Sequence, residues 1–273
     1  MSELPEYRAF VLPQEPKKIE RGSYVLLIAG AIGSGKSTLF KMIIENYKDH
    51  KITPIYEYID DPEYKEGAQI HLQDYLKGVE NDLTFQNYIQ CYYLAKMAPQ
   101  NVQNKEIIIL ERGVDDSLAI FCNLANKKRK LDVLNFAMLY TNCLRMNETV
   151  TFPSYFFKNF EMSKIRTNKK IIELYEEVAK IINDDLEKGV KNRVIALYNS
   201  PAECYDRMYT RARNGETSVY TKEYIELNCR MYENIYRMIE DPTREQINFV
   251  DLGKLFDPVD WSQICPDVKS NGY

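Results

Sequence analysis

Residues Gly30 to Ser37 form the clearest chemical pattern in the sequence. They read Gly-Ala-Ile-Gly-Ser-Gly-Lys-Ser and match GxxxxGK[ST]. In a loop of this kind the backbone N–H groups and the N-terminus of the following helix point at phosphate oxygens. Lys36 adds a positive charge toward the β- and γ-phosphates, and the Ser37 hydroxyl is a ligand for Mg²⁺. The pattern predicts a nucleotide site that is built from Gly30, Gly33, Ser34, Gly35, Lys36, Ser37 and Thr38.

The phosphate pattern requires a strand before the loop and a helix after it, and the flanking residues supply both. Tyr24 to Ala29 is an unbroken apolar run of strand length that leads into the loop. Leu39, Ile43 and Ile44 then share one face of a helical pattern. The sequence context therefore favours a functional nucleotide site over a glycine-rich turn that binds nothing.

Glu111 and Arg112 follow another apolar run, residues 106–110. Ligands of open α/β sheets bind outside the carboxyl ends of the strands, so this pair is predicted to lie at the site. A regulatory GTPase is disfavoured because the chain has no DxxG switch, and Asn126-Lys-Lys-Arg lacks the Asp of the guanine motif NKxD. The short α/β chain favours a small-molecule kinase as the interpretation of the loop.

The elements that must position these residues alternate along the chain. The apolar runs of strand length are 24–29, 52–56, 106–110, 193–198 and 246–250. The helical patterns are 39–44, 85–97, 131–146, 171–186 and 224–239. This alternation predicts an α/β layer fold around a five-stranded parallel sheet. Pro54 cannot donate to a sheet ladder, which predicts that the run 52–56 is an edge strand.

The overall composition excludes some classes of partner. The 273 residues include 36 Lys and Arg against 40 Asp and Glu, a net charge of −4. This acidic balance argues against a protein that grips nucleic acid over a broad basic face. The longest apolar run, residues 24–32, is far too short to span a bilayer. We therefore expect neither nucleic acid nor a membrane as a partner.

Cysteine usage bears on the cellular compartment. The six cysteines are scattered without a CxxC pair, and with His50 and His71 as the two histidines we expect no Cys/His zinc site. Without an apolar signal segment, we expect free thiols and a reducing, cytoplasmic location. Residues 1–22 are acidic and Pro-rich, which is typical of a loosely ordered lead-in rather than a mitochondrial presequence. Residues 23–273 contain no dividing linker and are expected to form a single kinase domain.

Several short motifs follow the phosphate loop in a fixed order. They are Glu57, Tyr75, Phe85-Gln86, Glu111-Arg112, Arg207-x-x-x-Arg211-Ala-Arg213 and Glu216. This set resembles the deoxynucleoside kinase family, the salvage kinases that include deoxycytidine and deoxyguanosine kinases and the insect multisubstrate enzyme. The resemblance covers about residues 22–125 and 193–256. It implies a three-layer P-loop fold with an Arg-rich lid over about residues 207–219.

The resemblance implies transfer of the ATP γ-phosphate to the 5′-hydroxyl of a deoxynucleoside in nucleotide salvage. A primary hydroxyl is a poor nucleophile until its proton is accepted, and Glu57 is the expected general base. Ser37 and Glu111 would hold Mg²⁺. Arg207 would lie against the adenine of ATP, and Phe256 would belong to a loop that closes over it. The cations expected to stabilise the transferred phosphate are Lys36, Arg112, Arg211 and Arg213.

Four further residues are expected to bind the deoxynucleoside. The Gln86 amide offers a donor and an acceptor to a base edge. Phe121 resembles the aromatic residue that sandwiches the base. Tyr75 and Glu216 together are predicted to read the 3′-hydroxyl, with Glu216 as the acceptor. Members of the resembling family are usually homodimers, so a second copy of the chain is the expected protein partner.

The chain departs from the family pattern beside the base. The family usually has E-P-V-x-x-W after the second strand, whereas residues 57–62 read Glu-Tyr-Ile-Asp-Asp-Pro. The Trp that packs by the base is therefore absent. Tyr58 or Tyr64 could take its place, and the spacing does not decide between them.

A second departure concerns base choice. In the resembling family, a paired Arg and Asp behind the base disfavour the methyl group of thymine. The matching positions here are Tyr93 and Ser117, and neither is charged. We therefore predict a preference for pyrimidines in which thymidine is accepted, although the bulk of Tyr93 could refill the space.

The stretch of about 123–192 is longer than in the family pattern and is treated as an insertion. It contains a basic run, residues 127–130, which is interpreted as a solvated loop, and an aromatic segment, residues 152–160.

Two other functions stay open at this point. A thymidylate-type nucleoside monophosphate kinase would normally carry a DR[YF]-type motif, which Glu111-Arg112-Gly113 fits less well. A non-catalytic deoxynucleoside-kinase-like subunit of a larger assembly is disfavoured by the intact Gly35-Lys36-Ser37 and Glu57. Turnover with deoxynucleosides, with monophosphates or with neither would distinguish the three.

Overall fold

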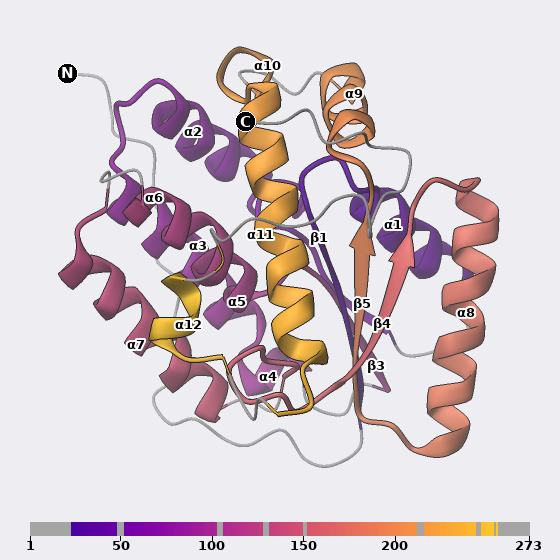
Figure 1. Cartoon of the computed structure of the whole chain (residues 1–273). Helices are drawn as coiled ribbons and strands as arrows, with labels where there is room; N and C mark the ends of the chain where they lie inside the picture. Colours follow the sequence, from indigo (N-terminus) through magenta and orange to yellow (C-terminus); the bar gives the residue numbers. More distant parts are fainter. Residues whose placement is uncertain are drawn as a thin grey trace.

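A five-stranded parallel sheet forms the centre of the computed structural model (Figure 1). The strands are β1 (Tyr24–Gly30), β2 (Ile52–Ile55), β3 (Ile107–Glu111), β4 (Glu161–Arg166) and β5 (Asn192–Tyr198), and their spatial order is β2-β3-β1-β5-β4. The structure describes residues 23–47, 52–102, 106–127, 131–149, 152–211, 216–243, 247–253 and 255. The predicted N-terminal segment, residues 1–22, lies outside this range.

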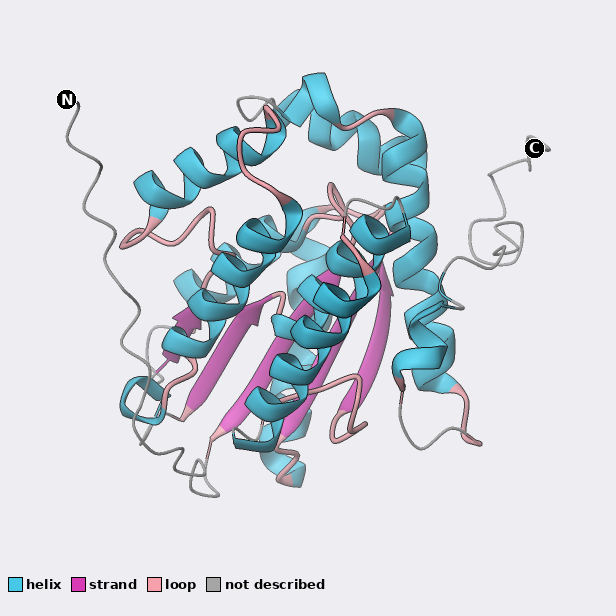
Figure 2. Ribbon diagram, turned by 90° about the vertical axis from the view of Figure 1, so that its left-hand side faces the viewer, coloured by secondary structure: helices cyan, strands magenta, loops and turns pink. Residues whose placement is uncertain are grey.

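Helices cover both faces of the sheet and make three layers (Figure 2). Alternate side chains of β1 enter two different cores because successive residues of a strand point to opposite faces. Tyr24, Leu26 and Ile28 pack with helices α1 (Lys36–Asn46) and α8 (Ile171–Lys188). Val25, Leu27 and Ala29 pack with helices α3 (Asp82–Lys96) and α11 (Lys222–Glu240). Burial on both faces explains the unbroken apolar run in the sequence.

The remaining helices lie around this frame (Figure 1). They are α2 (Lys65–Leu76), α4 (Pro99–Val102), α5 (Val114–Asp116), α6 (Asn123–Lys127), α7 (Val133–Thr149), α9 (Pro201–Arg211), α10 (Glu216–Val219) and α12 (Phe249–Gly253). The segment η1 (Ser117–Cys122) is a π-helix, a form that often occurs at functional sites. Within the described residues, no helix combines the length and the apolar character needed to cross a membrane.

The five predicted helical patterns are confirmed as α1, α3, α7, α8 and α11. Four of the five predicted strands are also confirmed, as β1, β2, β3 and β5. β2 is an edge strand, as Pro54 predicted, and it pairs with β3 in a parallel register that places Pro54 beside Ile109.

The prediction of a strand at 246–250 is wrong. Residues 247 and 248 belong to no strand, and α12 begins at Phe249. Two carboxamides bind this part of the chain to helices α6 and α11 and not to the sheet. The side-chain amide of Asn123 donates to the carbonyl of Leu252 at 2.6 Å, and that of Asn234 donates to the carbonyl of Leu255 at 2.8 Å.

The fifth strand is instead β4, which lies within the segment that was predicted to be an insertion. β4 pairs with β5 as the outer strand of the sheet. Ile165 is the one fully buried residue of the six in β4, so the strand shows no apolar run in the sequence. A pattern search tuned to strands buried on both faces misses such a segment.

Candidate active site

The phosphate loop joins β1 to α1 through two glycines with left-handed backbone angles, Gly33 at φ 78° and Gly35 at φ 95°. Two neighbouring helices hold this loop. A Cβ atom on Gly33 would lie 2.0 Å from the carbonyl oxygen of Cys204 in α9. The backbone N–H of Ile32 donates to the Asn228 side chain of α11 at 2.9 Å. A side chain at position 33 would therefore push α9 away from the loop.

Lys36 and Ser37 begin α1 and turn toward the loop and β3. The Lys36 ammonium donates to the carbonyl of Ala31 at 2.9 Å, and burial, with help from the Arg112 charge, lowers its pKa to about 7. The Ser37 hydroxyl donates to the Glu111 carboxylate at 2.5 Å. The other Glu111 oxygen is buried and has no hydrogen-bond partner among the described residues, and the same is true of the Ser34 hydroxyl. Phosphate oxygens and a cation would satisfy these buried groups.

Glu57 and Arg112 form a buried ion pair next to this loop. Glu57 follows β2 and Arg112 follows β3, so the parallel sheet places both at the same edge. Arg112 adopts φ 60°, a backbone angle that is rare for a non-glycine residue and is often found at functional sites. Burial alone would lower the pKa of Arg112, but the charge of Glu57 raises it well above the ordinary value. The guanidinium is therefore a permanent positive charge.

A group of carboxylates could receive a cation here. Glu57, Asp60 and Glu111 each offer an oxygen, and these atoms lie within 4.8 Å of one another. Burial and the neighbouring Glu57 charge raise the pKa of Glu111. Oxygen ligands of this kind suit Mg²⁺. The predicted metal ligands Ser37 and Glu111 therefore fit the ion, and Asp60, which carried no signal in the sequence, lies beside them.

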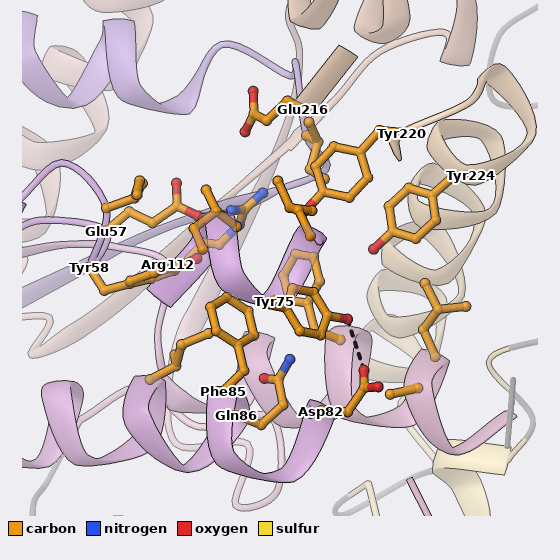
Figure 3. Close-up of a pocket in the computed structure, with 18 of the residues that line it drawn as sticks. Glu57, Tyr58, Tyr75, Asp82, Phe85, Gln86, Arg112, Glu216, Tyr220 and Tyr224 are labelled. Atoms are coloured by element: carbon orange, nitrogen blue, oxygen red, sulfur yellow. Dashed lines mark hydrogen bonds and ion pairs between the residues drawn. The ribbon is translucent and has the colours of Figure 1, made fainter. Parts of the chain in front are cut away.

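A cavity of about 250 Å³ opens next to the phosphate loop (Figure 3). All six residues predicted to bind the substrate line it, and they are Glu57, Tyr75, Gln86, Arg112, Phe121 and Glu216. Gly33, Lys36 and Arg211 line the same cavity, so it is continuous with the phosphate site. The Arg112 guanidinium lies 5.2 Å from the centre of the Phe121 ring, which positions Phe121 at the boundary between the two.

Aromatic rings form much of the cavity wall. Tyr75 stacks on Phe85 with ring centres 4.2 Å apart, and Tyr58 meets Phe85 edge-on at 5.8 Å. Tyr64 does not line the cavity, because it packs against Tyr92. Of the two candidates for the missing Trp, Tyr58 is therefore the one in the wall.

Sequence reasoning missed three further lining residues, Asp82, Tyr220 and Tyr224 (Figure 3). Asp82 is the first residue of α3 and accepts the phenol hydrogen of Tyr75 at 2.8 Å. Burial, with the Asp82 charge, raises the pKa of Tyr75, so the phenol stays protonated. The four-residue spacing of Tyr220 and Tyr224 beside the predicted lid was the signal that could have pointed to them.

Two hydrogen bonds fix the side-chain amide of Gln86. Its oxygen accepts from the Ser117 hydroxyl at 2.9 Å and from the Cys122 thiol at 3.5 Å. Both donors belong to the π-helix η1. Tyr93 is buried and donates to the backbone carbonyl of Glu111 at 3.2 Å, so it does not line the cavity.

The predicted lid is described in part. The Arg211 guanidinium donates to the Glu216 carboxylate at 2.7 Å, which links α9 to α10 beside the cavity. The guanidinium of Arg207, also in α9, donates to the hydroxyl and the carbonyl of Thr167, the residue that follows β4. Arg213 and Phe256 lie outside the described residues. An Arg-rich lid over 207–219 therefore stays a prediction.

A three-layer fold with a central parallel sheet and this phosphate loop defines a P-loop protein, and the strand-end Glu–Arg pair and the cavity adjoin its nucleotide site. The family model "Deoxynucleoside kinase" matches residues 26–168, just over half of the chain, and the chain belongs to that family. Among solved structures, deoxyadenosine kinase from M. mycoides with bound dATP is similar at 18% identity over 78% of this chain and 84% of that chain, with a TM-score of 0.46. Similarity at this level says nothing about the substrate of this chain. No curated protein matches the sequence.

Replacing Gly33 by Ala is expected to weaken both stability and nucleotide binding. Gly33 and Gly78 share a left-handed φ, at 78° and 73°, but nothing lies within 4 Å of a Cβ on Gly78. Gly78→Ala therefore costs about 1–2 kcal/mol of backbone strain. Gly33→Ala costs more because it also displaces α9. Urea denaturation and nucleotide titration of both variants measure the difference, and equal behaviour would contradict the close contact.

Proposed function

We propose that this protein is an ATP-dependent deoxynucleoside kinase that transfers the γ-phosphate to the 5′-hydroxyl of its substrate. The observation that carries the proposal is the position of the Glu57–Arg112 pair, where the aromatic cavity meets the phosphate loop. A hydroxyl at that point has a carboxylate beside it and the phosphate loop in front of it. Residues 23–273 would act as one kinase domain in cytoplasmic nucleotide salvage, with 207–219 as its lid.

Each charged side chain has a separate task in this proposal. Glu57 accepts the proton of the 5′-hydroxyl as that oxygen attacks phosphorus. Arg112 holds Glu57 in place and stabilises the charge on the transferred group. Lys36 leaves the Ala31 carbonyl for the phosphates, whose negative charge favours its protonated form. Arg211 lies in the cavity wall beside the loop and adds a further cation.

Mg²⁺ is the metal that the donor set fits. Ser37 and Glu111 would hold it, with Asp60 close enough to contribute through water. When bound, the ion would neutralise negative charge on the β- and γ-phosphates. The buried Glu111 oxygen without a partner among the described residues is the group that such an ion would satisfy.

Glu57→Gln tests the general base. Glutamine keeps the shape and retains an acceptor for Arg112, but it cannot take a proton. We expect unchanged deoxynucleoside binding and a loss of about two or more orders of magnitude in kcat. Glu66→Gln, an exposed carboxylate on α2, is the matched control. A kcat near that of the wild type in Glu57→Gln would reject the role.

We further propose that Tyr75 and Glu216 read the 3′-hydroxyl from opposite sides of the cavity, with Tyr220 between them in Figure 3. Glu216 accepts the hydroxyl proton. The phenol hydrogen of Tyr75, which Asp82 accepts in this structure, turns to the sugar oxygen. Because Glu216 is tied to Arg211, occupation of the sugar site is linked to the position of a phosphate-facing cation.

The test of this assignment compares a 2′,3′-dideoxynucleoside with its 3′-hydroxyl parent. A hydrogen bond to a charged partner is worth about 1.5–3 kcal/mol, so the parent should be favoured by roughly ten- to a hundredfold in kcat/KM. Tyr75→Phe combined with Glu216→Ala should abolish this preference. Equal use of both nucleosides by the wild type, or full discrimination by the double variant, would show that the sugar is read elsewhere.

For the base, we propose a pyrimidine preference with thymidine accepted. The support is the uncharged surface behind Gln86, where Ser117 and Cys122 are small and Tyr93 is turned away from the cavity. Nothing charged among these three residues opposes the methyl group of thymine. Competition among the four deoxynucleosides at equal concentration, with thymidine monophosphate as a fifth acceptor, measures which acceptor the protein prefers. A clear purine preference, or turnover of the monophosphate alone, would contradict it.

A homodimer is also proposed, and α7 is the surface that supports it. Three apolar side chains on this helix are exposed, Val133 at 60%, Leu134 at 80% and Met138 at 42%. Exposed apolar groups of this kind, one helical turn apart, commonly mark an interface. The expected protein partner is therefore a second copy of the chain.

A further inference from the structure

β1 and its phosphate loop divide the carboxyl edge of the sheet into two halves. The cavity that contains Glu57 and Arg112 lies on the side of β2 and β3, and β5 and β4 continue the sheet on the other side. Under the proposed function the first half holds the acceptor nucleoside. The base of a donor whose phosphates fill the loop must then lie over β5 and β4.

The strand register brings the end of β4 level with the phosphate loop. Gly30 pairs with Leu197 in β5, and Leu197 pairs with Ile165 in β4. Neighbouring strands lie about 4.8 Å apart, so Ile165 is about 10 Å across the sheet from Gly30. Pairing continues one step further, since the N–H of Thr167 donates to the carbonyl of Tyr198 at 3.0 Å. Residues 167–170, called the β4–α8 turn below, therefore stand at the same edge as the loop.

Arg207 of α9 spans the space between the loop and this turn. Its two terminal nitrogens donate to Thr167, one to the carbonyl at 2.6 Å and the other to the hydroxyl at 3.2 Å. One of these nitrogens also lies 3.6 Å from the position that a Cβ on Gly35 would occupy. Two hydrogen bonds fix the plane of the guanidinium, and a fixed guanidinium plane offers a face on which a base can stack.

The residues after Thr167 have the chemistry of a purine site. Asn168 is exposed and carries a carboxamide. A carboxamide matches the adjacent donor and acceptor on an adenine edge in a two-point hydrogen bond. Ile171 and Ile172 follow at the start of α8 and are exposed at 36% and 46%, which is apolar surface beside that carboxamide.

We propose that the β4–α8 turn borders the donor adenine site beside Arg207, at the edge of a base that stacks on the guanidinium face. Asn168 reads the base edge, and Thr167 is a positioning residue that orients Arg207. The inference rests on the proposed function. The family resemblance gave the role of covering adenine to Phe256, but the described residues just before it, Leu252 and Leu255, are bound to α6 and α11. The edge strand β4 replaces the predicted C-terminal strand, and the turn that follows it takes that place beside the base.

Photolabelling of the full chain with 8-azido-ATP, without acceptor, locates the adenine directly. Cleavage after Glu yields separate peptides for residues 162–173 and 246–273. We expect the label on 162–173. Label on 246–273 would overturn the inference and return the role to the C-terminal segment.

Titration with fluorescent mant-ATP and mant-GTP tests the individual side chains. Asn168→Ala should raise the Kd for mant-ATP at least fivefold and reduce the preference for ATP over GTP. Asn183→Ala is the matched control, because it removes an exposed carboxamide about 18 Å further along α8, and the Tyr47 hydroxyl that donates to Asn183 keeps the carbonyl of Ala179 as an acceptor. Thr167→Val should also weaken the ATP preference, and Thr167→Ser, which keeps the hydroxyl, should restore it.

The outcomes separate this inference from the proposed function. No binding of mant-ATP to the wild-type protein would contradict ATP as the donor. Binding by the wild type that Asn168→Ala leaves unchanged, together with an unchanged ATP preference, would show that the turn does not contact the base. Asn168 is exposed, so folding of this variant is expected to be normal and is checked by its melting temperature.

Discussion

Four buried charges, at the start of α1 and at the carboxyl ends of β2 and β3, set the constraint on which the site depends. Lys36, Glu57, Glu111 and Arg112 are all at least nine-tenths buried. Two are cations and two are anions, and buried charges are tolerated when they are paired and hydrogen-bonded. The four charges therefore sum to zero, and removing one member would leave another without compensation.

This balance also explains why the groups respond to a ligand. Burial and the neighbouring guanidinium lower the pKa of Lys36, while burial and the neighbouring carboxylate raise that of Glu111. Each shift reflects a buried charge that its neighbours in the protein do not fully compensate. A polyanion with its metal ion would bring charges of both signs to the same place, so binding would compensate the buried charges of Lys36 and Glu111.

A second layer of groups holds Arg112 in its unusual backbone angle. Its N–H donates to the carbonyl of Ile28 at 3.0 Å, which continues the pairing between β1 and β3 beyond the end of the strand. Asp116 lies behind it and accepts from the N–H of Gly113 at 2.9 Å. Burial raises the pKa of Asp116 to about 6, and the Arg112 charge opposes that rise. The Arg112 backbone is thus anchored by the sheet and by a buried acid together.

Most of the frame could be predicted because strands buried on both faces and glycine-bound phosphate loops have strong sequence signatures. The six substrate positions around one cavity followed from motifs, and their roles stay predictions. Asp82 and Asp60 could not be found in this way, since a carboxylate at a helix start or in a turn matches no pattern until the fold brings it to the site. β4 was not predicted for a related reason, because an edge strand with one buried residue has no apolar run.

The order of the strands has a consequence for how the chain folds during synthesis. β4 pairs with β5, which is made later, and β5 must enter between β1 and β4. Val25 of β1 pairs with Asn192 of β5, so one edge of β1 has no strand partner until most of the described chain has been synthesised. Contacts between such distant residues slow folding and leave strand edges exposed to other chains. The strand that leads into the phosphate loop thus gains its second neighbouring strand late. The nascent protein acquires its nucleotide site only when β5 pairs with β1.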